Sequence, residues 1–246
     1  MYHPRATFVT AARILRQLSH DHRTLAMIFV VPCVLLGLLR WLYSDNETTF
    51  QAIAPALLAI FPFVIIFIIT SITTLRERTG GTLERLMAMP IGKLDLVVGY
   101  LFAFGLLAII QAMLASALLL YGLGLDVAGA HGMVVVIAVG DALLGTALGI
   151  FVSAFAQTEF QAVQFMPALI LPQVLIGGLL MPLNQMPDVL EVLAYCLPLT
   201  YAIDALRSVV QLPEMNEDIY RDMIVVSAFI VGGIVMAATT LRRRSK

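Results

Sequence analysis

Six stretches of almost uninterrupted apolar residues recur along the chain. They cover about residues 25–43, 51–74, 94–122, 133–156, 162–181 and 223–241. An α-helix needs roughly 20 mostly apolar residues to cross the hydrocarbon core of a bilayer. Because a backbone in lipid must satisfy its own hydrogen bonds, we expect each stretch to be helical. The pattern predicts an all-α integral membrane protein with six transmembrane helices.

A seventh apolar run, Val189–Leu199, is too short to cross a bilayer. It lies in the region 182–222, which is rich in proline, and two short helices are predicted there, Met186–Leu197 and Thr200–Val210. Backbone that enters a membrane without crossing it must be covered by protein or line a polar cavity. We therefore expect a re-entrant helical segment between spans 5 and 6.

The distribution of Lys and Arg predicts the orientation of the chain. With a cytoplasmic N-terminus, six spans place 12 of the 15 basic residues inside: Arg5, Arg13, Arg16, Arg23, Arg76, Arg78, Arg85, Lys93, Arg242, Arg243, Arg244 and Lys246. Cytoplasmic segments of membrane proteins carry this excess of positive charge. A seventh crossing would put the terminal RRRSK sequence outside. Both termini are therefore predicted to be cytoplasmic in a multi-pass protein of the plasma or inner membrane.

The composition agrees with a membrane protein and excludes several classes. The chain of 246 residues is 60% hydrophobic and 13% charged, against about 25% charged residues in typical soluble domains. Its net charge of −1 favours no nucleic acid partner. The two cysteines, Cys33 and Cys196, lie in apolar surroundings and form no disulfide or metal pattern. Residues 1–24 are mixed in polarity and are not expected to be a cleavable signal.

Residues Arg76–Pro90, RERTGGTLERLMAMP, interrupt the apolar sequence between spans 2 and 3. Gly80 and Gly81 are expected to end the second helix, and Thr82 is a suitable N-cap for a new one. Leu83, Leu86 and Met87 then share one helical face, while Glu84 and Arg85 point elsewhere. The pattern predicts a short amphipathic helix on the inner membrane surface. On physical grounds it is either a docking element or an ordinary interfacial helix.

Motifs for catalysis are missing from the sequence. The chain has no Walker phosphate loop, no HExxH zinc motif and no serine-hydrolase spacing, so we expect neither a catalytic nor a metal site. Asp141 is the one acid well inside a predicted span. A carboxylate there is costly, so it should face protein or water. It either lines a substrate pathway or bonds to a Ser, Thr or Arg of a neighbouring helix.

Two motifs resemble the membrane subunits of type-2 ABC exporters, in particular the daunorubicin-type drug-efflux permeases. The first is Arg76–Pro90, and the second is Gly177–Val210, GGLLMPLNQMPDVLEVLAYCLPLTYAIDALRSVV. The features of the second motif that match the family are Gly177, Gly178, Pro182, Met186, Pro187, Pro198, Leu199, Thr200, Tyr201, Leu206 and Arg207. The Gly80-Gly81 pair departs from the family, which often has a charged residue before its glycine.

The resemblance implies roles for three parts of one transmembrane domain, residues 1–246. Residues 1–24 would form a connecting helix, with Arg13 and Arg16 on it, although a basic anchor for anionic lipid fits as well. Residues 76–90 would be a coupling helix that contacts a separate ATPase. Residues 182–222 would roof the pathway. The implied coupling residues are Glu77, Gly80, Gly81, Thr82, Leu83, Glu84, Arg85, Leu86 and Met87, and the implied outer gate is Pro187, Leu190, Leu193, Pro198, Tyr201 and Arg207.

The resemblance also implies the partners. The chain would carry no cofactor of its own, and Mg-ATP would be bound and hydrolysed by a cytoplasmic ABC ATPase subunit. A second permease copy, or a related permease, would complete the pathway in the lipid bilayer. Short outer loops favour a lipophilic substrate, with export of a lipid-linked glycan as the alternative. An ion-driven secondary transporter would normally show several intramembrane carboxylates, and a scaffold would need no ATPase.

Overall fold

The computed structural model describes residues 4–80, 93–181 and 183–240, and its regular structure is entirely helical. The helices are α1 (Pro4–Ser19), α2 (His22–Leu42), α3 (Glu47–Thr79), α5 (Lys93–Ala117), α6 (His131–Ser153), α7 (Glu159–Ile176), α8 (Asp188–Tyr195), α9 (Pro198–Gln211) and α10 (Glu217–Thr240). A π-helical turn, Leu118–Gly122, prolongs α5. The predicted all-α class is confirmed.

Six of the described helices are long and apolar enough to cross a bilayer: α2, α3, α5 with its π-helical turn, α6, α7 and α10. This confirms the six predicted spans. Two of them extend further than the apolar pattern indicated, because α3 continues to Thr79 and α10 begins at Glu217. Backbone hydrogen bonding continues past the end of the apolar stretch, so hydropathy marks the membrane core rather than the helix ends.

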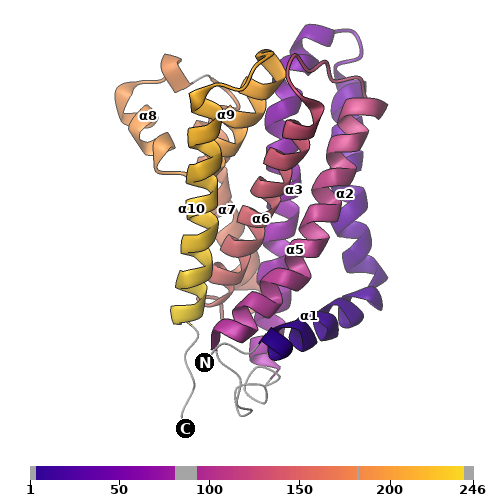
Figure 1. Cartoon of the computed structure of the whole chain (residues 1–246), viewed down its shortest axis with the longest axis vertical. Helices are drawn as coiled ribbons and strands as arrows, with labels where there is room; N and C mark the ends of the chain where they lie inside the picture. The colour runs from indigo at the N-terminus through magenta and orange to yellow at the C-terminus, as the bar shows by residue number, and fades with distance from the viewer. Residues whose placement is uncertain (1–3, 81–92, 182, 241–246) are drawn as a thin grey trace.

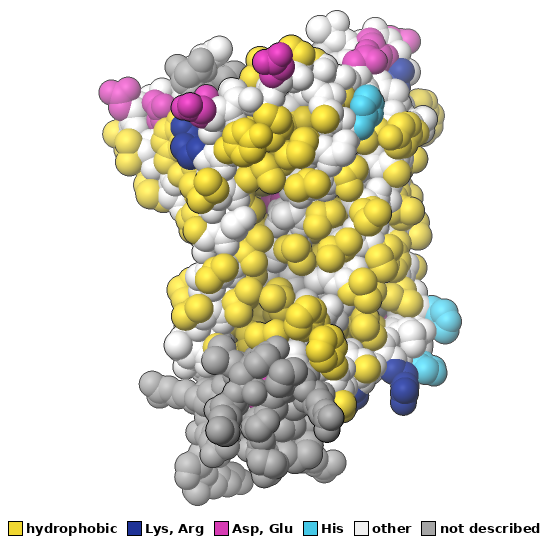
Figure 2. Space-filling model, viewed as in Figure 1, with side chains coloured by type: hydrophobic (Ala, Val, Ile, Leu, Met, Phe, Trp, Pro, Cys, Tyr) yellow, Lys and Arg dark blue, Asp and Glu magenta, His cyan; other side chains and the backbone are white. Residues whose placement is uncertain are grey.

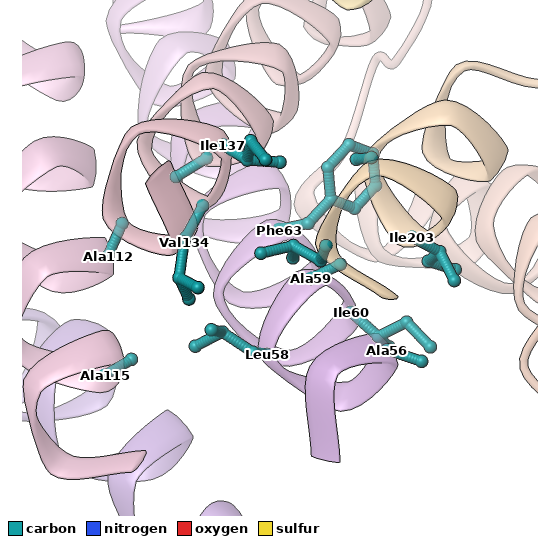
Figure 3. Packing of buried hydrophobic residues seen from close by; sticks show 14 of the residues in the cluster. Ala56, Leu58, Ala59, Ile60, Phe63, Ala112, Ala115, Val134, Ile137 and Ile203 are labelled. Atoms are coloured by element: carbon teal, nitrogen blue, oxygen red, sulfur yellow. The ribbon is translucent and has the colours of Figure 1, made fainter. Parts of the chain in front are cut away.

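The spans form a bundle in which α3, α5 and α6 are central (Figure 1). In each of these three, 61% of the most apolar 18 residues are buried, against 17% in α2, α7 and α10. The centre is packed with small, branched and aromatic side chains, such as Ala59 and Phe63 of α3 near Ile137 of α6 (Figure 3). At Gly145 of α6 an added Cβ would lie 2.8 Å from the Phe63 carbonyl oxygen. Glycine there lets α3 and α6 pack at backbone distance.

The bundle has two distinct ends. Helix α1 lies across the lower end in Figure 1, where α10 also finishes; we call this the α1 end. Helices α8 and α9 lie at the upper end, the α8 end, with a bend of 96° between them. That bend confirms the two short helices predicted within 182–222. On the face shown in Figure 2, acidic side chains gather at the α8 end, above a largely hydrophobic middle.

Candidate functional site

The helix expected within residues 1–24 is present as α1, which ends at Ser19. Ala11, Ile14 and Leu18 are buried, whereas Phe8 and Val9 are more than half exposed. The buried positions recur every three or four residues, so they form one helical face. This face packs on α2 and α5. The chain therefore holds α1 against the bundle and leaves its other face open.

Helix α1 approaches α5 most closely at Gly99. A Cβ added to this glycine would lie 2.9 Å from the Cβ of Thr10 and 3.1 Å from the Thr7 carbonyl oxygen. Real Cβ atoms essentially never come so near another atom. Any larger residue would therefore push α1 away from the bundle.

An ion pair joins α1 to the end of α3. The Arg13 guanidinium donates to the Glu77 carboxylate at 2.8 Å, and the hydroxyl of Tyr100, on α5, donates to the same carboxylate at 3.4 Å. Glu77 is 6% exposed. Burial lowers the pKa of Arg13, but its hydrogen bond and charge interaction with Glu77 raise the pKa, and the net direction is upward. The three side chains tie α1, α3 and α5 together.

The residues on either side of Glu77 bind two further helices. Arg76 forms a two-pronged ion pair with Glu159 at the start of α7, with distances of 2.7 Å and 2.8 Å. Arg78 donates to the Ser153 carbonyl oxygen at the end of α6. Three consecutive side chains thus connect the last turn of α3 to α7, α1 and α6. A displacement of this turn would therefore act on α1, α6 and α7 at the α1 end.

The coupling residues predicted from sequence are only partly described. Gly80 caps α3, its N–H donating to the Arg76 carbonyl oxygen at 2.9 Å. Outside the described residues lie Gly81, Thr82, Leu83, Glu84, Arg85, Leu86 and Met87. Glu77 is buried and paired with Arg13, so a direct contact of its carboxylate with another subunit would require this pair to open.

A groove of about 660 Å³ runs along the exposed side of α1. Its lining residues are Val9, Ala12, Arg13, Arg16, Gln17 and His20. Arg16, which was singled out with Arg13, is exposed there and forms no ion pair with a described residue. The two arginines therefore differ, since Arg13 anchors the helix and Arg16 remains open to a partner or to lipid.

At the α8 end, hydrogen bonds hold the bend between α8 and α9. The Tyr201 hydroxyl donates to the Tyr195 carbonyl oxygen at 2.7 Å. The hydroxyl of Thr200 donates to the Ala194 carbonyl oxygen at 2.8 Å. Pro198 occupies the first turn of α9, where its missing N–H costs nothing. These contacts fix the angle of α8 to α9.

Arg207 connects α9 to the end of α7. Its guanidinium donates to the carbonyl oxygens of Gly178 and, at 3.2 Å, Leu179. The turn that follows α7 contains Gly178 with φ +96°, a conformation that L side chains rarely adopt. Arg207 thus satisfies carbonyls that the end of the helix leaves free. The predicted gate residues Tyr201 and Arg207 both act as clamps within this region.

The remaining predicted gate residues lie on α8 or at its start. Leu190 and Leu193 are 39% and 49% exposed, and Ala194 is the buried residue of this helix. Pro187 is also exposed. The described part of the chain therefore leaves the apolar residues of α8 exposed. The assignment of these residues to a gate stays a prediction.

Asp141 lies at the centre of α6 and is fully buried. Neither of its carboxylate oxygens has a hydrogen-bond partner among the described residues. The second of the two alternatives, a bond to a Ser, Thr or Arg of a neighbouring helix, is therefore not found among the described residues. Helices α3, α5 and α10 pack against α6, but no described side chain of theirs donates a hydrogen bond to this carboxylate.

Sequence patterns did not reveal several of these contacts. Tyr100, Glu159 and Ser153 were not singled out, because the residues that they bind lie 23, 83 and 75 positions away. A pairing over such distances leaves no local signal. The one available clue was the run of alternating charges at Arg76–Arg78 next to an apolar span.

Residues 5–210 match the family described as ABC-2 type transporter. The chain belongs to this family. The match covers α1 to α9 apart from their first and last residues and ends before α10.

Several curated proteins are similar to the chain. ABC transporter G family member 20 of Dictyostelium discoideum is 24% identical over 82% of this chain and 28% of its own length. The probable multidrug ABC transporter permease YbhS of Escherichia coli is 27% identical over 69% of this chain and 45% of its own length. The inner membrane transport permease YhhJ of Escherichia coli is 22% identical over 72% of this chain and 47% of its own length. The chain spans less than half the length of these relatives.

Proposed function

We propose that this chain is the membrane-spanning subunit of an ATP-driven exporter that moves a lipophilic substrate out of the cytoplasm or the inner leaflet. A separate ABC ATPase would bind and hydrolyse Mg-ATP. The membership in the ABC-2 type transporter family carries this proposal. The name multidrug permease of the relative YbhS favours a lipophilic substrate of the drug-efflux kind.

In this proposal the α1 end faces the cytoplasm and both termini lie on that side. The excess of Lys and Arg near this end supports the orientation, since cytoplasmic segments of membrane proteins carry an excess of these residues. The acidic side chains at the α8 end agree with it. The protein would then reside in the plasma or inner membrane.

The last turn of α3 is the proposed input for the ATPase. It leads directly into residues 81–92, and its side chains Arg76, Glu77 and Arg78 bind α7, α1 and α6. A push on this segment would be transmitted to several helices at once, because packed helices move as rigid bodies between discrete arrangements. Alternating access then needs only a shift in the relative population of two such arrangements.

A second permease copy would complete the pathway. In each of α2, α7 and α10 only 17% of the apolar window is buried within the chain, so these helices have apolar surface to offer to lipid or to a partner. Gly145 is not part of such a surface, because it packs against α3. A Cβ added at Gly140 of α6 or at Gly232 of α10 would meet nothing within 4 Å, so the chain leaves both positions open to a neighbour.

Export of a lipid-linked glycan is the alternative within the same family. The name of the relative YbhS, a probable multidrug permease, favours drug efflux over this alternative. An ion-driven transporter is less well supported, because Asp141 is the one fully buried carboxylate at the centre of a described span. A glycan exporter would not export a lipophilic dye, and an ion-driven transporter would move the dye without ATP.

The decisive experiment is transport in proteoliposomes. The tagged chain is purified from native membranes together with its ATPase and reconstituted, and export of the lipophilic dye Hoechst 33342 is followed by fluorescence. We expect dye export that requires ATP and stops with vanadate. Liposomes containing the ATPase alone are the control. Dye movement that ignores ATP but follows an imposed ion gradient would overturn the proposal.

A further inference from the structure

A polar pocket lies at the α8 end, where α7, α8 and α9 meet. Its volume is about 320 Å³. The lining residues are Gly177, Gly178, Leu183, Tyr195, Ile203, Asp204, Arg207, Ser208 and Gln211. The pocket thus combines one cation, one anion, an aromatic ring and two neutral polar side chains. None of these was predicted to bind a ligand.

The two charged residues of the pocket, Asp204 and Arg207, form no direct ion pair with each other. Asp204 and Arg207 are one helical turn apart on α9, but no ion pair within 4 Å joins them. Arg207 instead directs donors at the carbonyl oxygens of Gly178 and Leu179. A guanidinium has five N–H donors, so some remain for a ligand. Asp204 accepts no hydrogen bond from the described residues.

No described side chain of α10 forms an ion pair with Asp204 either. Arg221 binds Asp218 at 3.0 Å and Asp222 at 3.1 Å, so its hydrogen bonds are not directed at Asp204. Burial raises the pKa of the Asp204 carboxyl, and burial lowers the pKa of the Arg207 guanidinium. Burial is the largest cause in both cases; Arg221 and Arg207 act against the rise for Asp204, and Asp204 acts against the fall for Arg207. A ligand that offers both charges would satisfy both groups.

The volume and the surroundings limit the ligand. Pockets for drug-sized molecules begin at roughly 300 Å³, so this one has room for a small polar group but not for a whole lipid. Strongly exposed apolar side chains lie on the neighbouring turn and on α8: Leu180, Val189 and Val192 are 71%, 72% and 65% exposed. On the α8 side in Figure 2, acidic side chains form the rim and hydrophobic ones lie below them. Such a border between polar and apolar surface is typical of the headgroup level of a bilayer.

We propose that the pocket between α7 and α9 binds the zwitterionic headgroup of an aminophospholipid. Arg207, Ser208 and Gln211 would bind the phosphate oxygens, and Asp204 would bind the ammonium group, next to the ring of Tyr195. The acyl chains would lie along the exposed apolar surface of α8. This site is independent of the proposed transport, since it requires only that the α8 end lies at the membrane surface.

The test is a binding measurement on the purified full chain in detergent. Dihexanoyl phosphatidylethanolamine is titrated by calorimetry, with dihexanoyl phosphatidylglycerol as a lipid that lacks the amine. We expect at least about tenfold tighter binding of the ethanolamine lipid, since a factor of ten corresponds to about 1.4 kcal/mol, the range of one charged hydrogen bond. Equal binding of the two lipids would overturn the proposal.

Variants locate the binding. Asp204→Asn removes the counter-charge for the amine and should abolish the preference, whereas Asp188→Asn, at an exposed acid on α8, should leave it intact. Gln211→Glu adds a negative charge to the pocket and should weaken phosphate binding while preserving the Arg207 clamp. Unchanged preference in folded Asp204→Asn protein, judged by its melting temperature, would refute the site.

A competition experiment identifies the source of the headgroup. Free glycerophosphoethanolamine is added at increasing concentration to the lipid-bound protein. If the free headgroup displaces the lipid, the polar group alone is recognised. If it does not, and the protein still prefers the ethanolamine lipid, the site recognises membrane lipid. Displacement that is equally strong in Asp204→Asn protein would contradict recognition by this pocket.

Discussion

Three neighbouring side chains at the end of α3, those of Arg76, Glu77 and Arg78, each bind a different helix. Glu77 points into the bundle and is 6% exposed, whereas Arg76 is 56% exposed and reaches α7. Exposed ion pairs contribute about 0–1 kcal/mol because water screens them. A buried carboxylate that loses its partner is far more costly. The pair of Glu77 with Arg13 should therefore dominate the stability of this end.

The first prediction tests this pair. Arg13→Met leaves the buried Glu77 carboxylate without its counter-charge and should lower the melting temperature of the purified protein by about 2–6 °C. This range corresponds to about 1–2 kcal/mol, reduced from the fully buried case because Arg13 is 33% exposed. Adding Glu77→Gln to Arg13→Met should recover part of the loss.

The matched control is Arg76→Met, which removes an exposed ion pair and should change the melting temperature by less than about 2 °C. Additive losses in the Arg13→Met, Glu77→Gln double variant would show that the two residues do not depend on each other.

The second prediction concerns Asp141. By insertion scales, an aspartate at the centre of a span costs about 2.5–3.5 kcal/mol, and here it has no hydrogen-bond partner in the described residues. Asp141→Asn should therefore melt at or above the temperature of the unmodified protein. Thr146→Val, on the same helix, loses a bond to the Ala142 carbonyl oxygen at 3.0 Å and should melt lower. A larger fall for Asp141→Asn would reveal a stabilising partner of the carboxylate.

At the scale of helices, the position of α1 depends on its contact with α5. A helix within residues 1–24 was expected from the family resemblance, but its buried face, with Ala11 and Ile14, was not singled out. Its partner was not clear, because the close approach involves Gly99, which has no side chain and therefore no pattern. The ends of α3 and α10 were likewise missed, since polar residues such as Glu217 continue a helix without adding hydropathy.

The third prediction tests that contact. Gly99→Val places side-chain atoms where Thr10 already lies, so α1 must move outward and the Arg13–Glu77 pair must lengthen. Substrate-stimulated ATP hydrolysis in the reconstituted complex should fall several-fold, whereas membrane insertion should remain normal. Gly37→Val is the control, because a Cβ there meets nothing within 4 Å. Normal stimulation in Gly99→Val would show that the placement of α1 is irrelevant to coupling.

At the scale of the whole molecule, the apolar pattern predicted six spans and the re-entrant pair because length and composition alone constrain them. It could not predict the clamp of Arg207 on the turn at Gly178. That clamp depends on the two helices already being packed together and on a glycine with positive φ. Long-range contacts of single side chains are therefore the part of the site that only the structure supplies.

The last prediction concerns the sidedness of the whole bundle. An even number of spans places α1 and the end of α10 at one end, and the basic residues favour that end as cytoplasmic. With Cys33 and Cys196 replaced by alanine, single cysteines are introduced as Ser19→Cys at the α1 end and Glu217→Cys at the α8 end; both native side chains are exposed. A membrane-impermeant maleimide applied to intact spheroplasts should label Glu217→Cys protein and should label Ser19→Cys protein only after permeabilisation. Labelling of both in intact spheroplasts would contradict six spans, and the reverse pattern would place the α1 end outside, away from any ATPase.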